Sequence, residues 1–246
     1  MTRRRWIADE VSGDTAALLG EHATHLSRVL RAQIGQEFDI AAGDEVRRGT
    51  ITFISDDRIE FALGLERALK SVRLKSTPQI TLALSIFKFD RMEWAIEKCT
   101  EIGVTRIIPV IARRSDAHLA AAAVKRHERW VRIVRQAAEQ SRRAAPPEIT
   151  AAVKLKDLDS VVGEEQARVV LAESLAESEN ENRLGDVLPS GLSEVTLAVG
   201  PEGGWADGEL SWFRETGWVA ASLGSTILRA ETAAIVATAL ALEALR

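Results

Sequence analysis

Residues 194–205 read Glu-Val-Thr-Leu-Ala-Val-Gly-Pro-Glu-Gly-Gly-Trp, a short apolar run that leads directly into a glycine-rich turn. The run 194–199 predicts a buried strand, and the segment at about 207–216 predicts a helix. Glycines at 200, 203 and 204 permit positive φ and let backbone amides approach a ligand closely. A tight strand-to-helix turn without a ligand is the alternative, because the dinucleotide fingerprint GxGxxG is absent.

The same order of strand and helix extends in both directions from this turn. The expected elements are strands 79–87, 105–111, 167–172 and 218–223, and helices 90–102, about 118–143 and 230–245. Strands that alternate with helices predict an α/β domain with a mostly parallel sheet. In the helix 90–102, Asp90 and Glu93 have capping-box spacing, and Gly103 is the expected stop.

Upstream of residue 78 the pattern changes to a period of two. Apolar side chains such as Ile51 and Phe53 alternate with polar ones over 37–65, which predicts antiparallel hairpins. A short helix is expected at about 20–31. The sequence therefore predicts two domains, a β-rich one at 1–72 and an α/β one at 73–246.

The net charge of −4 hides a local asymmetry. Residues 113–143 hold nine Lys or Arg against three Asp or Glu, whereas 157–186 hold nine acidic residues against two arginines. Of the 32 basic residues, 25 are arginine, whose planar fork suits phosphate and base edges. A basic RNA-docking face and ordinary solvated helix faces both fit this pattern.

Other features limit the possible classes of protein. The longest apolar stretch, 232–242, is too short to span a bilayer, and Ala8-Asp9-Glu10 replaces the apolar core of an export signal, so a cytoplasmic location is expected. The single cysteine, Cys99, lies on an apolar helix stripe and is expected in the core. No Cys/His cluster has zinc spacing, so no metal is expected. The Glu/Ser/Asn-rich segment 173–186 is expected to be a mobile loop.

A second strand-to-helix junction, 223–233, holds two charged residues at the expected start of its helix. Glu231 suits the helix dipole there, whereas Arg229 opposes it. Arg229 therefore has either an outside anionic partner or a surface salt bridge. The segment 139–143, Glu-Gln-Ser-Arg-Arg, is by itself only a polar helix end.

Taken together, these segments resemble the 16S ribosomal RNA uracil-N3 methyltransferases of the SPOUT (trefoil-knot) superfamily. The matching pieces, in order over nearly the whole chain, are 25–31, Lys88 with 91–93 and 97–104, 139–143 with 147–149, 200–205, and 223–234. One departure is Ala206-Asp207-Gly208-Glu209, where the family usually has a capping serine. Asp207 is expected to take over the cap.

The resemblance implies a PUA-like β-barrel at the N-terminus, a knotted α/β methyltransferase domain and a homodimer. It implies S-adenosylmethionine as cofactor and, as substrate, the uracil at position 1498 of the 16S RNA, within the assembled 30S subunit. Two alternatives stay open: a non-catalytic RNA-binding ribosome-assembly factor, and a ribose 2′-O methyltransferase of the same superfamily.

Site residues follow from the same resemblance. The cofactor is expected to contact Leu171, Gly200, Pro201, Glu202, Gly203, Gly204, Leu223, Gly224, Ile227 and Leu228. The RNA is expected to contact Arg3, Arg4, Arg5, Arg28, Arg31, Arg142 and Arg143. Arg229 is the candidate for stabilising charge on the uracil, and Glu231 is a weaker candidate for the base or an orienting group. Gly203 is expected at positive φ, so that valine there would block the pocket.

Overall fold

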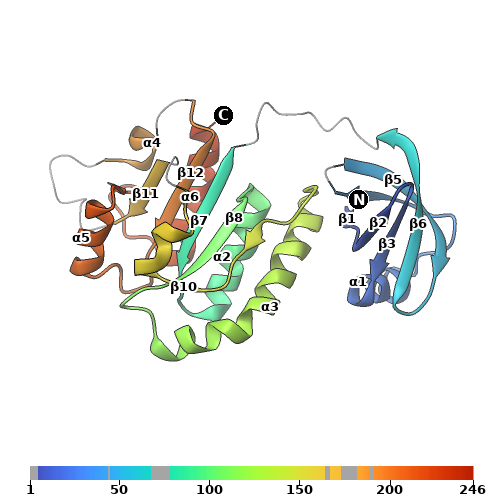
Figure 1. Ribbon diagram of the computed structural model, residues 1–246, viewed down its shortest axis with the longest axis horizontal. Helices are drawn as coiled ribbons and strands as arrows, with labels where there is room; N and C mark the ends of the chain where they lie inside the picture. Colours follow the sequence, from blue (N-terminus) through green and yellow to red (C-terminus); the bar gives the residue numbers. More distant parts are fainter. Residues whose placement is uncertain are drawn as a thin grey trace. The chain divides into compact units, whose positions relative to one another are not determined.

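The computed structural model describes residues 5–43, 45–67, 78–163, 167–172, 182–188 and 191–245. The chain divides into two compact units, each with its own sheet (Figure 1). The first unit contains residues 1–75 and 135–146, and the second contains 76–134 and 147–246. Residues 135–146 thus join the first unit, although the sequence prediction gave them to the second domain. The predicted boundary at 72/73 lies outside the described residues.

The first unit contains a six-stranded sheet in the order β1-β4-β5-β6-β3-β2, with β1 and β4 parallel and the other pairs antiparallel. Its strands are β1 (Trp6–Ile7), β2 (Glu10–Ser12), β3 (Thr15–Leu19), β4 (Glu37–Ala42), β5 (Glu45–Ile54) and β6 (Arg58–Arg67). The predicted hairpins over 37–65 are confirmed. Strands β1 to β3 were not predicted, because runs of two to five residues carry too little periodicity.

The predicted helix at 20–31 exists in a shorter form, as α1 (Gly20–Thr24) followed by a π-helical turn η1 (His25–Val29). Alternation within β5 is interrupted at two positions, of which the first lies between Arg47 and Gly49. The register between β5 and β6 shifts between Ile51 and Phe53, so Ile51 is buried whereas Phe53 is 47% exposed. A bulge adds one residue to one strand and so reverses the side-chain faces beyond it.

The second unit contains a seven-stranded sheet in the order β10-β8-β7-β12-β11-β13, with β9 also beside β8 (Figure 1). Its strands are β7 (Gln79–Ser85), β8 (Arg106–Ile111), β9 (Glu148–Ile149), β10 (Val153–Lys154), β11 (Ala167–Leu171), β12 (Glu194–Val199) and β13 (Val219–Ala221). Its helices are α2 (Phe89–Ile102), α3 (Ala117–Gln140), η2 (Leu155–Ser160, 3-10), α4 (Leu184–Val187), α5 (Asp207–Glu215) and α6 (Ala230–Ala244). Residues 135–140, at the end of α3, are counted with the first unit. Each recorded strand pair of this sheet is parallel, which confirms the predicted α/β architecture.

Both faces of this sheet are covered, as a parallel sheet requires. Leu82 and Leu84 of β7 pack in one core with residues of α2 and α6, whereas Ala83 between them faces a second core formed with η2 and α5. Period-two alternation along the strand produces this division. The second core contains an aromatic cluster in which Trp205, Trp212 and Trp218 surround Phe213 edge to face.

Strand order reverses around β11, which lies between the two strands that follow it in the chain, β12 and β13. The chain therefore passes from one side of β11 to the other through α5. Because all these strands are parallel, their carboxyl ends lie at one edge of the sheet. Ligands of open α/β sheets bind at such a reversal, outside the carboxyl ends of the strands.

Helix α2 confirms part of the predicted pattern. Gly103 ends the helix with φ of 137°, and Cys99 is fully buried. Burial raises the pKa of the Cys99 thiol to about 12, partly opposed by the Thr238 hydroxyl, so the thiol is unreactive. The predicted capping box is wrong, because Lys88 is the N-cap residue and the Glu93 carboxylate instead accepts bonds from arginines of α3.

The segment 173–186 is only partly described. Residues 173–181 lie outside the described residues. Leu184–Val187 forms the short helix α4, whose Leu184 side chain is 1% exposed and belongs to the core. The predicted loop was therefore too long at its C-terminal end, because Leu184 and Val187 supply apolar contacts that the Glu/Ser/Asn composition obscured.

Candidate functional site

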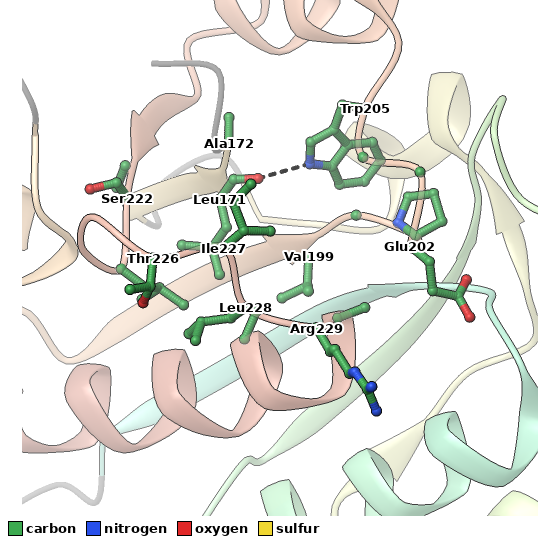
Figure 2. A pocket seen from close by; sticks show the side chains of 18 of the residues that line it. Leu171, Ala172, Val199, Glu202, Trp205, Ser222, Thr226, Ile227, Leu228 and Arg229 are labelled. Carbon is green, nitrogen blue, oxygen red and sulfur yellow. Dashed lines mark hydrogen bonds between the residues drawn. The ribbon is translucent and has the colours of Figure 1, made fainter. Parts of the chain in front are cut away.

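A cavity of about 520 Å³ lies at the carboxyl ends of β11, β12 and β13. Three segments form most of its lining: the end of β11, the glycine turn after β12, and the long loop between β13 and α6 (Figure 2). The structure brings all ten predicted cofactor residues to this cavity, namely Leu171, Gly200, Pro201, Glu202, Gly203, Gly204, Leu223, Gly224, Ile227 and Leu228. A cavity of this size accommodates a ligand as large as a nucleoside derivative.

Trp205 joins the first two of these segments. Its indole Nε1 donates a buried 3.0 Å hydrogen bond to the Leu171 carbonyl, drawn as a dashed line in Figure 2. A Cβ atom on Gly200 would lie 3.2 Å from the same Nε1, which is tighter than most real contacts. Gly200 is therefore required by the close approach of the indole, and Trp205 fixes the spacing between the two loops.

The glycine turn is closed by a 2.8 Å hydrogen bond from the Gly204 amide to the Pro201 carbonyl. Gly204 has φ of 67°, a conformation that disfavours other residues. The expectation of positive φ at Gly203 is wrong. A Cβ atom on Gly203 would meet only the Arg114 side chain, at an ordinary distance of 3.5 Å. Glycine composition identified the turn but could not show which glycine takes the left-handed conformation.

The start of α5 also differs from the prediction. Ala206 is the N-cap residue and Asp207 the first helical residue, so Asp207 does not provide the cap. Glu209 instead accepts a 2.8 Å hydrogen bond from the Ala206 amide and a 2.7 Å bond from the Arg113 amide. One carboxylate thus holds the end of the glycine turn to the loop after β8.

The third segment presents backbone groups to the cavity. Within the described ranges, residues 223–228 form no hydrogen bond, and Ile227 is 81% exposed. Gly224, with φ of 122°, lets this loop turn after β13. Free backbone donors and acceptors beside aliphatic side chains are typical of a site that binds a planar heterocycle.

Three arginines line the cavity. Arg114 donates a 2.7 Å hydrogen bond to the Gly203 carbonyl. Arg91 of α2 lies 3.8 Å from the Glu231 carboxylate, which is 8% exposed. Arg229, the N-cap residue of α6, is exposed and forms no ion pair with any described residue. In Figure 2 it lies toward the same end of the pocket as Glu202, opposite Ser222 and Thr226.

The two predicted catalytic residues therefore differ in position. Arg229 lines the cavity, whereas Glu231 is buried beside it and is not among the lining residues. The sequence reasoning gave no role to Arg91 or Arg114. Arg91 lies within a segment, 91–93, that matches the family, and this match could have identified it as a site residue. No comparable sequence signal pointed to Arg114.

The predicted RNA-contacting arginines that are described belong to the first unit. Arg28 is 63% exposed and lies 3.1 Å from Asp56, and Arg31 is exposed with φ of 51°. Arg5 bonds the Arg142 carbonyl, and burial lowers the pKa of Arg143. Arg3 and Arg4 lie outside the described residues.

In the described part of the chain, no three His, Cys, Asp or Glu side chains gather as metal ligands. No helix in those same ranges is both long enough and apolar enough to cross a bilayer.

Comparison with known proteins shows the family to which the chain belongs. Residues 75–242 match the family described as the RNA methyltransferase domain. The ribosomal RNA small subunit methyltransferase E of Synechocystis is 33% identical over 237 residues, which cover 94% of this chain and 74% of that protein. The protein of that name from Bacillus subtilis is 29% identical, with coverages of 91% and 88%. The chain belongs to the ribosomal RNA small subunit methyltransferase E family.

A solved relative shows the same fold with a ligand. The ribosomal RNA small subunit methyltransferase E of Neisseria gonorrhoeae, bound to S-adenosylmethionine, is 30% identical with a TM-score of 0.83. The match covers 96% of this chain and 95% of that one. A Legionella pneumophila protein solved with the same cofactor is 28% identical with a TM-score of 0.81.

Proposed function

We propose that this chain transfers a methyl group from S-adenosylmethionine to N3 of a uracil in small-subunit ribosomal RNA, the uracil at position 1498. The observation that carries the proposal is the cavity of about 520 Å³ at the reversal of strand order. Membership of the family and the cofactor in the Neisseria relative support it.

The residues present fit this cofactor. The backbone groups of the loop 223–228 have no hydrogen-bond partners among the described residues, and they suit the polar edge of an adenine. Leu171, Leu223 and Leu228 offer apolar contacts to the faces of the adenine ring. The glycine turn leaves room for a ligand to approach the backbone. When bound, the cofactor supplies an activated methyl group.

Arg229 is the residue we propose for charge stabilisation. Uracil N3 carries a proton at neutral pH and must lose it, to solvent water, before its lone pair can attack a methyl group. Negative charge then develops on the ring oxygens, and a guanidinium that lines the pocket stabilises that charge. Arg229 lines the cavity, is exposed and has no ion pair among the described residues.

Glu231 fits a positioning role better than that of the base. Its carboxylate is 8% exposed, and one oxygen lies 3.8 Å from the Arg91 guanidinium, which does line the cavity. A buried acid in the first turn of α6 is also stabilised by the helix dipole. We propose that Glu231 orients Arg91 toward the cavity.

The finer architecture is part of the same proposal. The position of β11 between β12 and β13 supports a trefoil knot, in which the loop before α6 passes through an earlier one. The six-stranded sheet of the first unit supports a PUA-like module that contacts RNA through Arg3, Arg4, Arg5, Arg28, Arg31, Arg142 and Arg143. Trp94 of α2 and Leu240 of α6, 47% and 43% exposed on helices that pack together, support a homodimer through this pair of helices.

The test uses purified protein, cofactor with a labelled methyl group, and either free small-subunit RNA or assembled 30S subunits from a strain that lacks this methylation. Nucleosides are separated and identified by mass spectrometry. We expect the methylated nucleoside to be 3-methyluridine, and we expect a higher yield with assembled 30S subunits than with free RNA. A 2′-O-methylnucleoside would contradict base methylation. RNA binding without methyl transfer would favour a non-catalytic assembly factor.

A further inference from the structure

A second hollow of about 410 Å³ lies in the second unit, at the carboxyl ends of β8 and β10. Its walls are residues 111–113 after β8, residues 154–156 after β10, and Gly208, Glu209 and Trp212 of α5. None of these residues lines the cofactor cavity. We call this hollow the basic pocket.

The charge of the basic pocket is positive. Arg113, Lys154 and Lys156 are exposed, and none of them forms an ion pair with a described residue. The one acidic residue in its lining is Glu209, whose two oxygens each accept a backbone amide, from Ala206 and from Arg113. Three cations without an ion pair to any described residue, around one acid that already accepts two amides, favour an anionic ligand.

The floor of the basic pocket is apolar and contains one aromatic ring. Ile111, Ala112 and Leu155 form part of it, and Trp212 is half-buried. The Trp212 ring is held by Phe213, with ring centroids 5.2 Å apart at an angle of 68°. A flat indole bordered by cations matches a nucleotide, whose base stacks on the ring while its phosphate meets the cations.

The two pockets adjoin along the chain. Arg113 lines the basic pocket, and the next residue, Arg114, lines the cofactor cavity and donates to the Gly203 carbonyl. Helix α5 contributes Leu210 to the cofactor cavity, and Glu209 and Trp212 to the basic pocket. The two cavities therefore lie beside each other on the second unit, within the reach of one RNA strand.

We propose that the basic pocket binds a nucleotide of the substrate RNA that flanks the methylated uracil, with the phosphate on Lys154, Lys156 and Arg113 and the base on Trp212. This inference rests on the proposed function, because it takes the bound polymer to be the substrate RNA. It adds a specificity site in the second unit to the arginines proposed for the first.

The test measures binding of a labelled single-stranded RNA that copies the target segment, by fluorescence anisotropy at several salt concentrations. The double variant Lys154→Ala/Lys156→Ala removes two exposed charges. Its matched control, Lys125→Ala/Arg214→Ala, removes two exposed charges from the same unit that line neither cavity. Because the two lysines contact the same phosphate, we expect the slope of log affinity against log salt to become shallower by about 0.7 in the double variant, and to stay unchanged in the control.

The aromatic floor is tested separately. Trp212→Leu keeps apolar packing on Phe213 and should weaken binding by about five- to a hundredfold, whereas Trp212→Phe should keep most of the affinity. An RNA that lacks the base next to the target uracil should bind wild type and Trp212→Leu equally. Calorimetry should show unchanged affinity for S-adenosylmethionine in all these variants.

The outcomes distinguish the two proposals. If the lysine double variant keeps the slope and affinity of its control while the wild type methylates RNA, the basic pocket inference is overturned and the proposed function stands. If the wild type transfers no methyl group but its RNA binding still depends on the lysines and Trp212, the basic pocket stands and the proposed function fails.

Discussion

Replacing Trp205 with phenylalanine should weaken cofactor binding through loss of one hydrogen bond. Trp205 is 5% exposed and donates from Nε1 to the Leu171 carbonyl at 3.0 Å. Phenylalanine keeps an aromatic ring against Phe213, whose centroid lies 4.8 Å away, but has no donor. The variant therefore removes the hydrogen bond between the first two loops and keeps the packing of the aromatic cluster, so that the effect of the bond can be measured by itself.

The size of the effect follows from the burial of that bond. A protein hydrogen bond contributes about 0.5–1.5 kcal/mol net, and a buried acceptor left without a partner costs about 1–3 kcal/mol. The free energy of unfolding should therefore fall by about 1–3 kcal/mol in Trp205→Phe. If the same bond holds the pocket in its binding conformation, the dissociation constant for S-adenosylmethionine should rise about five- to tenfold, because tenfold corresponds to about 1.4 kcal/mol.

Trp218→Phe provides the matched control. Trp218 is 4% exposed, lies on the same Phe213 ring at 5.1 Å, and donates from Nε1 to Asp159 at 3.1 Å, but it does not line the cavity. Calorimetric titration and urea unfolding are run on both variants. Both should lose stability, and only Trp205→Phe should lose cofactor affinity. Equal cofactor affinity in the two folded variants would refute the argument that Trp205 spaces the loops.

Three further predictions concern single residues. Gly204→Ala should lower stability by about 1–2 kcal/mol and weaken cofactor binding, since its φ is 67°, whereas Gly203→Ala should be nearly neutral in both measurements. Arg229→Ala should lower single-turnover methyl transfer by roughly a hundredfold with little change in cofactor affinity, and Arg229→Lys should restore it only in part; a loss confined to melting temperature would make the residue structural. Burial alone would raise the pKa of Asp9, but hydrogen bonds from His22, the Leu19 amide and Arg135 outweigh it and lower the pKa from 3.8 to about 2. The ionised Asp9 therefore stabilises the first unit above about pH 4, and this contribution, at most about 2 kcal/mol, is lost as the pH falls toward 2. Urea unfolding of wild type and Asp9→Asn between pH 5 and pH 2 should show the difference shrinking in that window, and a constant difference would contradict it.

Much of the second unit could be predicted because its strands are apolar runs separated by helices with clear starts and stops. Gly103 ended α2 as expected, and the strand at 194–199 was found within its true bounds. Local capping was predicted less well. Asp90 and Asp207 have the residue types of caps, yet Lys88 and Ala206 occupy the cap positions. The position of a cap depends on the φ and ψ angles of a single residue, and the type of that residue restricts these angles only weakly.

The three loops of the pocket could be predicted, together with Arg229. Glycine and aliphatic residues after three predicted strands indicated the loops, since parallel strands place their carboxyl ends at one edge. Charged side chains from other parts of the chain were missed. Arg114 follows β8 and reaches the Gly203 carbonyl, 89 residues away in sequence. No local pattern encodes a contact over that separation, so the sequence could not show that Arg114 borders the site.

The start of α6 bears on a question that the sequence left open. Arg229 opposes the helix dipole, and the sequence allowed either a salt bridge or an outside anion as the reason for an arginine there. Glu231 is the nearest acid in sequence, but the guanidinium near its carboxylate belongs to Arg91, at 3.8 Å. Arg229 is left exposed on the cavity without an ion pair among the described residues. Folding therefore gains little from this charge, which supports the proposed role of Arg229 toward a ligand that becomes negative in the pocket.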